Sequence, residues 1–396
     1  MKLSKLVKKF QRVWKEEGKL EAVRRSFHFM GNVEGRRSRR IDAHNARITK
    51  GNVLFINGCC VEHPTRYRVF HQMEQLENAG ITCAKVYFED IDLSMGENYE
   101  LFIFYRCECT EDVEKFIKKA QSDNKKVFFD IDDLVTDVKY TDQIPFVQEL
   151  SPLNKKLFDN SVMQMGKTMR LCDFLITTTT ALAEELGKEV AHIYVNRNTV
   201  SKEMIECAES AYQEYKKDSD KIKLGYFSGS LTHNKDFEVI RPALTRILRE
   251  YPNVELLLVG ELAASDELNE FSGRVKKLET TNWRELPKLI VQADINLAPL
   301  EDTLFNRAKS ELKWFEAALV RVPTVASAIG AFAEMVEDGR TGVLSDNDTE
   351  TWYEGLKRLI DNASLRENIG VAAYEVVIAQ CTTASITEEY MKFLFS

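Results

Sequence analysis

The sequence predicts an α/β protein with two domains of similar construction. Short apolar segments of strand length alternate with longer amphipathic segments, and this alternation occurs in two successive series. The predicted strands are apolar on both faces, as in parallel sheets that helices cover on both sides. With 396 residues, 44% of them hydrophobic, the chain can form two cores. We therefore expect two Rossmann-like domains that face one another across a cleft, preceded by a basic amphipathic helix.

Residues 1–50 are predicted to form a basic arm and a linker. They contain fifteen Lys or Arg and five Asp or Glu, about +10, so the rest of the chain carries about −18. Leu3, Leu6, Phe10 and Trp14 recur at helical spacing between basic residues. Such a helix can lie on an anionic membrane surface, aided by the following run Arg36, Arg37, Arg39 and Arg40. A helix packed on the protein body and a disordered arm are the alternatives.

The totals exclude several classes of protein. The strongly acidic remainder does not suit a nucleic-acid binder. No run of eighteen apolar residues occurs, and the first thirty residues are too charged for a secretory signal peptide. The eight cysteines lack the spacing of a zinc site and suit the free thiols of a reducing compartment. We expect a cytoplasmic protein that can associate peripherally with the inner face of the plasma membrane.

The first series, residues 51–200, predicts a complete α/β domain. Its strands are expected at 52–58, 81–88, 99–106, 125–132, 173–179 and 191–196. Helices are expected near 65–79, 111–122, 152–171 and 180–187.

The second series, residues 201–380, predicts another such domain and begins with a polar helix near 201–218. Its strands are expected at 221–228, 254–260, 275–279, 295–300, 324–327 and 342–345. Helices are expected near 236–250, 283–293, 308–319, 331–337, 349–362 and 365–379. A last helix within 381–396 can pack back on the first domain.

The stretch 295–330 reads as strand, loop, helix, proline break and strand. In a helix over 308–319, Lys309, Lys313 and Glu316 line one side next to an apolar stripe. Two ammonium groups and a carboxylate near a helix start suit a ligand with phosphates and hydroxyls. The alternative is a solvated face on which these charges pair with one another.

A second candidate loop, 225–237, follows the first strand of the second domain. Its glycine permits close backbone approach, its amides can hold phosphate oxygens, and its lysine adds a charge. The candidate residues are Gly229, Ser230, His233, Asn234 and Lys235.

These motifs together resemble the family 4 glycosyltransferases of GT-B architecture, of the kind that build bacterial surface polysaccharides. The resemblance rests on the loop at 225–237, ADINLAPL, KSELKWFEAALVRVPTVAS and EMVEDGRTGVL, and it covers most of residues 221–380. By this resemblance Glu316 binds the donor ribose and Lys235 neutralises its diphosphate. Two positions depart from the family, Ser230 for an arginine and Ala308 for a glutamate. We expect Lys309, Ser310 and Lys313 to supply the missing contacts.

In the first domain the resemblance is looser and marks the acceptor side through Gly58, Arg66 and Arg68. Asp130, Asp132 and Asp133 follow a strand there, where a carboxylate can act as a base or hold an acceptor hydroxyl. Asp-x-Asp also occurs at metal sites, and aspartates at such a position can simply cap a helix or orient a basic side chain.

His63, on the loop after the first strand, is a further catalytic candidate.

The resemblance implies a retaining hexosyltransferase that uses a nucleotide-diphosphate sugar, without cofactor or metal, on a saccharide or lipid-linked acceptor. Two alternatives remain: a nucleotide-sugar epimerase of similar fold, and a non-catalytic partner subunit in which Ser230 and Ala308 mark a decayed donor site. No Gly-x-Gly-x-x-Gly or Gly-x-x-x-x-Gly-Lys-Ser motif supports dinucleotide redox chemistry or ATP hydrolysis.

Overall fold

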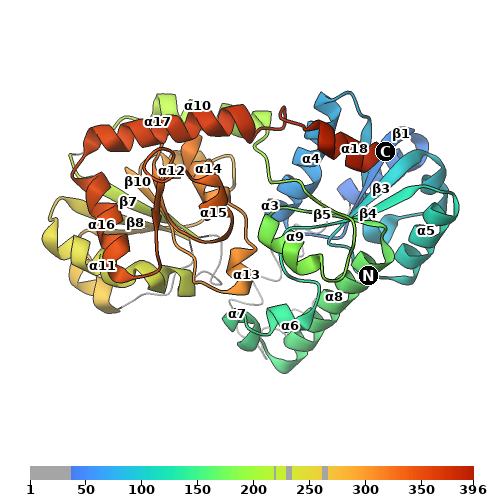
Figure 1. The fold of residues 1–396 in the computed structure, drawn as a ribbon, viewed down its shortest axis with the longest axis horizontal. Helices are drawn as coiled ribbons and strands as arrows, with labels where there is room; N and C mark the ends of the chain where they lie inside the picture. Colours follow the sequence, from blue (N-terminus) through green and yellow to red (C-terminus); the bar gives the residue numbers. More distant parts are fainter. Residues whose placement is uncertain (1–36, 218–219, 229–233, 261–265) are drawn as a thin grey trace, which may run out of the picture.

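The computed structural model describes residues 37–217, 220–228, 234–260 and 266–396. In these residues it has two α/β domains, each built around a six-stranded sheet (Figure 1). All strand pairings within both sheets are parallel. The predicted fold class is confirmed for the two domains. The basic helix expected near the N-terminus lies outside the described residues.

The first domain has the strand order β2-β1-β3-β4-β5-β6. Its strands are β1 Gly51–Asn57, β2 Cys83–Tyr87, β3 Tyr99–Tyr105, β4 Lys126–Ile131, β5 Phe174–Thr177 and β6 Ile193–Val195. Its helices are α3 Glu62–Thr65, α4 His71–Asn78, α5 Glu111–Ser122, α6 Val138–Thr141, α7 Pro145–Gln148, α8 Pro152–Leu171 and α9 Thr180–Leu186, and a π-helical turn, Arg66–Phe70, joins α3 to α4.

The second domain has the strand order β12-β11-β10-β7-β8-β9. Its strands are β7 Ile222–Phe227, β8 Val254–Val259, β9 Val275–Leu278, β10 Ile295–Ala298, β11 Thr324–Ser327 and β12 Val343–Ser345. Its helices are α10 Lys202–Glu214, α11 Asn234–Glu250, α12 Leu286–Ile290, α13 Leu304–Arg307, α14 Leu312–Ala318, α15 Gly330–Met335, α16 Thr349–Ile360 and α17 Ala363–Gln380, and α18 Glu388–Phe395 ends the chain.

Most strands are apolar on both faces because each sheet has a core on either side, whereas the edge strand β9 is largely exposed. In β1, Leu54 and Ile56 belong to one hydrophobic cluster, whereas Val53 and Phe55 belong to another. The second cluster includes side chains of α18, so the last helix packs on the first domain (Figure 1). The chain therefore crosses between the domains twice.

The two crossings lie beside each other. The backbone N–H of Val200 in the first donates to the carbonyl of Cys381 at 2.7 Å, and the N–H of Thr383 donates back to Val200 at 3.0 Å. The two connecting segments therefore form one hydrogen-bonded hinge.

The expected linker before β1 is wrong in part, because residues 37–48 are helical. Ala43 and Ala46 of this helix are buried in the first domain, and Asp42 pairs with Lys85 at 2.6 Å. Two alanines are a weak apolar pattern, which is why the sequence did not reveal this helix. None of the helices described is long and apolar enough to span a membrane.

Candidate functional site

Both sheets change winding direction beside their first strand. In the first sheet, β1 lies between β2 and β3, and in the second, β7 lies between β8 and β10. Ligands of such sheets bind outside the carboxyl ends of the strands at this switch point. The loop after β1 and the loops after β7 and β10 are the ones that the sequence selected. The fold therefore places both candidate regions where ligands bind.

Lys313, in the first turn of α14, has a buried ammonium group. Its Nζ lies 4.4 Å from the centroid of the Tyr226 ring and makes no hydrogen bond to any residue that the structure describes. Burial lowers the pKa of Lys313 to about 8, with Asp236 raising it and Lys309 lowering it further. A buried ammonium without hydrogen-bond acceptors is costly, so this position suits an anionic ligand.

Asp236 joins α11 to the loop after β10 and holds Lys309 near Lys313. Its carboxylate accepts hydrogen bonds from the backbone N–H of Glu301, at 2.9 Å, and from the amide of Asn306, at 2.8 Å. The Nζ of Lys309 lies 3.9 Å from the same carboxylate. The two lysines therefore both lie near Asp236 in the first turn of α11.

The helix expected over 308–319 is two shorter helices, α13 and α14, with a break between them. At the break the carbonyl of Ala308 accepts a hydrogen bond from Thr179 at 2.9 Å, and Ser310 accepts one from Asn198 at 3.0 Å. Lys309 thus lies on a loop, whereas Lys313 and Glu316 lie on α14. The break makes residues 308–310 part of the contact between the domains.

Glu316, the expected ribose ligand, is contacted by the first domain. Tyr67 donates its hydroxyl to the Oε1 atom of Glu316 at 2.6 Å. The same oxygen lies 3.8 Å from a guanidinium nitrogen of Arg66 and 3.9 Å from Nε2 of His63. Burial raises the pKa of Tyr67 well above its usual value, so its hydroxyl stays a donor, and burial lowers the pKa of His63. The candidate donor and acceptor sides therefore meet at Glu316.

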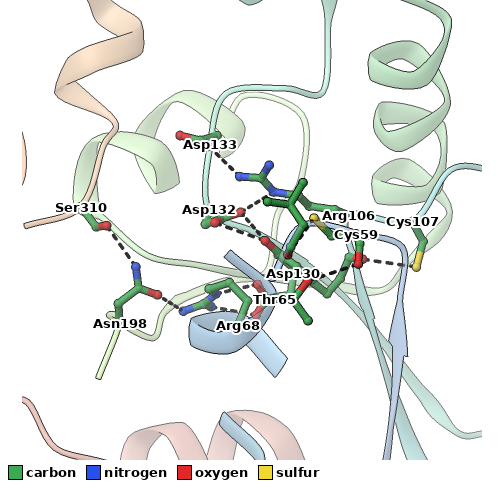
Figure 2. A network of polar contacts seen from close by, with 12 residues as sticks. Cys59, Thr65, Arg68, Arg106, Cys107, Asp130, Asp132, Asp133, Asn198 and Ser310 are labelled. Carbon is green, nitrogen blue, oxygen red and sulfur yellow. Dashed lines mark hydrogen bonds and ion pairs between the residues drawn. The ribbon is translucent and has the colours of Figure 1, made fainter. Parts of the chain in front are cut away.

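Asp130 does not face the acceptor side as expected (Figure 2). Its carboxylate is fully buried and forms two hydrogen bonds of 2.8 Å with Arg68, while Gln72 donates a third at 2.6 Å. Arg68, also expected on the acceptor side, is equally buried and donates to Asn198 at 3.2 Å. Both residues therefore stabilise the first domain and its hinge, and neither reaches a substrate.

Asp132 and Asp133 remain partly exposed and share one arginine (Figure 2). Arg106 donates to each carboxylate at 2.6 Å, and the hydroxyl of Tyr105 lies 3.1 Å from Asp132. Arg106 has a left-handed backbone, with φ of 45°, and a Cβ at Gly58 would lie 2.3 Å from its carbonyl oxygen. Gly58 is thus required for Arg106 to take this place.

The Asp-x-Asp spacing of Asp130 and Asp132 also occurs at metal sites, so the surroundings of these aspartates were compared with those of a metal site. Among the residues that the structure describes, no three His, Cys, Asp or Glu side chains gather as a metal site needs. Arg106 already supplies positive charge to two of the three aspartates.

Other predicted donor residues lie in or beside the loop after β7. Gly229, Ser230 and His233 lie outside the described residues, and Asn234 begins α11. Lys235 is exposed in the first turn of α11.

Sequence reasoning missed Tyr67 and Asp236, each next to a predicted residue. Tyr67 stands between Arg66 and Arg68, and Asp236 follows Lys235. Proximity to a candidate loop was the available signal, but neither side chain has a spacing that distinguishes it from a core or capping residue.

Comparisons with known proteins found relatives of the second domain in sequence and of both domains in fold. Residues 223–362 match the family model described as "Glycosyl transferases group 1". The D-inositol 3-phosphate glycosyltransferase of Corynebacterium diphtheriae is 30% identical over 166 residues, which are 39% of this chain and 38% of the relative. The enzyme of the same name from a Nocardioides species is 36% identical over 171 residues, 38% of this chain and 36% of the relative. The matched stretch thus spans less than two fifths of these relatives.

The fold comparison covers both domains. HepE of Anabaena, solved in complex with UDP, aligns with a TM-score of 0.60 at 14% identity, over 87% of this chain and 99% of HepE. A glycosyltransferase of Rickettsia africae aligns with the same TM-score at 13% identity, over 88% of this chain and 99% of that one. Residues 223–362 thus match the group 1 glycosyl transferases, and the whole chain shares the two-domain α/β fold of the solved glycosyltransferases, as its motifs predicted.

Proposed function

We propose that this protein is a glycosyltransferase that moves a sugar from a nucleoside-diphosphate donor to an acceptor hydroxyl. The observation that supports this most is the buried ammonium of Lys313, which has no hydrogen-bond acceptor among the described residues and stands near Lys309 and Glu316. A diphosphate supplies the acceptor oxygens that this ammonium lacks, and a ribose suits the carboxylate. HepE, whose fold is similar, was solved with UDP and with UDP-glucose.

In the proposed reaction the bond between the sugar C1 and the diphosphate oxygen breaks, and C1 bonds to the acceptor oxygen. The acceptor proton leaves with the diphosphate or enters solvent. Lys235, Lys309 and Lys313 stabilise the charge on the departing diphosphate, which is a task that other glycosyltransferases assign to a metal. The family resemblance suggests retention of configuration at C1. Asp132 and Asp133 orient the acceptor, and the opposed domains exclude water.

The proposed acceptor is a saccharide or a lipid-linked saccharide at the cytoplasmic face of the membrane, in surface polysaccharide synthesis. The basic pattern of residues 1–30 supports a membrane surface. WaaG, a glycosyltransferase of lipopolysaccharide biosynthesis, has a similar fold, with a TM-score of 0.53. Removing residues 1–30 is expected to abolish binding to anionic liposomes, and retained binding would contradict the membrane role.

Incubation with a panel of nucleotide sugars tests the activity. Transfer to added saccharides, or slow hydrolysis of one donor, is the expected result. Interconversion of sugar isomers without transfer would favour an epimerase, and absence of binding to the whole panel would favour a non-catalytic subunit. Lys235→Ala, Lys309→Ala and Lys313→Ala should each weaken donor binding. Unchanged affinity in all three variants would contradict the proposed donor site.

A further inference from the structure

Arg66 of the first domain has a buried guanidinium that forms no hydrogen bond with a described residue. Its side chain is 4% exposed, and its three nitrogens are all without a hydrogen-bond partner there. A guanidinium is always charged and carries five N–H donors, so burying it without acceptors is costly. Oε1 of Glu316, in the second domain, lies 3.8 Å away, which is ion-pair distance but beyond hydrogen-bonding distance. The charge of Arg66 therefore acts on Glu316 through space.

Trp283, in the loop between β9 and α12, contacts the same guanidinium from the second domain. The Cζ atom of Arg66 lies 4.5 Å from the centroid of the Trp283 ring and 4.6 Å from that of Tyr67. A cation within about 6 Å of an aromatic ring is attracted to it, most strongly when both are shielded from water. Arg66 thus meets the second domain at two side chains, Trp283 and Glu316.

The contacts from the first domain to Glu316 all involve one of its two carboxylate oxygens. Oε1 accepts the hydroxyl hydrogen of Tyr67 at 2.6 Å and lies 3.8 Å from Arg66. Nε2 of His63 is 3.9 Å from the same oxygen, and burial lowers the pKa of His63, so this ring is uncharged at neutral pH. The contacts of the described residues thus leave Oε2 for a ligand.

Arg66 and Tyr67 are the first two residues of the π-helical turn, Arg66–Phe70, that joins α3 to α4. Turns of this kind are rare in proteins and occur often at functional sites. The ring of Tyr67 also lies 5.9 Å from that of Phe315, the neighbour of Glu316 in α14. The start of this turn therefore packs directly against the helix that carries Glu316.

We propose that Arg66 is a positioning residue that orients Glu316 for the donor ribose when the two domains are close together. The inference rests on the proposed function, which assigns Glu316 to the ribose. The contacts of Arg66 and Tyr67 with Oε1 restrict rotation of the carboxylate, and Oε2 is left to accept a ribose hydroxyl. The lysines of the second domain bind the diphosphate without the first domain, whereas recognition of the ribose requires it. Ribose binding and domain closure are therefore coupled.

Equilibrium titration of UDP, GDP and ADP into the full chain, each beside its 2′,3′-dideoxy counterpart, tests this role. The dideoxy nucleotide keeps the base and the diphosphate, so the ratio of the two Kd values reports the ribose hydroxyls alone. For the nucleotide that binds best, wild-type protein should favour the ribose form at least about tenfold, as expected for a hydrogen bond to a charged group. Arg66→Met should reduce this ratio to below about threefold and change the Kd of the dideoxy nucleotide less than about twofold.

Further variants separate the charge of Arg66 from its packing. Arg66→Lys keeps a cation beside the two aromatic rings and should retain a ratio of at least about fivefold. Methionine is apolar and fills the buried space without the charge, so lysine would do no better than methionine if Arg66 only packed. Trp283→Leu should also lower the ratio, because it removes one of the contacts that hold the guanidinium beside Glu316. Arg47→Met, at an exposed pair with Asp92, is the matched control and should keep the wild-type ratio.

The outcomes distinguish this inference from the function on which it rests. Equal ratios in wild type and Arg66→Met, or equal weakening of both nucleotides by that variant, would overturn the positioning role and leave the diphosphate site standing. A wild-type protein that does not distinguish the two nucleotides would overturn the ribose contact of Glu316 as well. Failure of every nucleoside diphosphate to bind would overturn the proposed function itself. Circular dichroism of each variant establishes that it is folded.

Discussion

The hydroxyl of Tyr67, in the first domain, donates a hydrogen bond of 2.6 Å to Glu316, in the second. Other polar contacts also join the two domains, such as that of Thr180 with Glu334, but this one engages the carboxylate proposed to bind ribose. A carboxylate has about four acceptor positions, so Glu316 can bind ribose hydroxyls while Tyr67 stays bound. The hydrogen bond from Tyr67 therefore forms only when the two domains are close together, and it ends at the residue proposed to bind the donor ribose.

Tyr67→Phe should favour an open arrangement of the two domains. A hydrogen bond to a charged group contributes about 1.5–3 kcal/mol, so its loss shifts the equilibrium roughly 10- to 150-fold. We expect a larger radius of gyration by small-angle X-ray scattering without ligand, and recovery of the wild-type value with donor. An unchanged scattering profile without ligand would show that Tyr67 does not hold the domains together.

Asp130→Asn should destabilise the first domain, because it leaves the buried guanidinium of Arg68 without its counter-charge. Breaking a buried ion pair costs about 3–5 kcal/mol. We expect the free energy of unfolding, determined by urea denaturation, to fall by about that amount. Glu270→Gln, at an exposed pair with Arg249, should cost no more than about 1 kcal/mol. Comparable losses in the two variants would argue against the structural role of Asp130.

Asp132→Asn should impair use of the acceptor and leave binding of the donor nucleotide unchanged. The carboxylate is partly exposed at the end of β4, and Arg106 holds it. We expect the KM for the acceptor to rise and kcat to fall, while the Kd of the nucleotide stays within about twofold of wild type. A change in the nucleotide Kd with unaltered acceptor kinetics would show that Asp132 acts on the donor and not on the acceptor.

Donor affinity should fall as the pH rises through about 8. Burial lowers the pKa of Lys313 to about 8, so the free protein loses this charge above that pH, whereas a bound diphosphate favours the protonated form. Below pH 8 the lysine is already charged and its contribution is constant. Calorimetric titration of a nucleoside diphosphate between pH 7 and 9.5 should show that the protein takes up a proton on binding above pH 8. The Lys313→Met variant should show no such uptake. Proton uptake that persists in Lys313→Met would assign it to another group.

All twelve strands in the described part of the chain were predictable from the sequence. Most of them are short apolar runs, although three of the four residues of β9 are exposed. The break between α13 and α14 was not predictable, since residues 308–311 contain no glycine or proline. The hydrogen bonds from Thr179 and Asn198, far away in the chain, impose it.

The positions of the candidate site residues also depend on contacts between distant parts of the chain, which the sequence pattern does not reveal. Asp130, Asp132 and Asp133 look equivalent in the sequence, and only the position of Arg68, 62 residues from Asp130, buries one of them. The lysines and Glu316 could be predicted because a family motif fixes their order. The contacts that Tyr67 and Arg66 make with Glu316 depend on how two domains meet, which no local pattern encodes.

The central claim, a nucleoside-diphosphate site in the second domain, is tested most directly by calorimetric titration of the preferred nucleoside diphosphate into wild-type protein and Lys313→Met. Removing one charge-assisted contact should raise the Kd at least about tenfold. Lys288→Met, at an exposed pair with Glu285, is the control and should leave the Kd unchanged. Equal Kd values for wild type and Lys313→Met would contradict the claim.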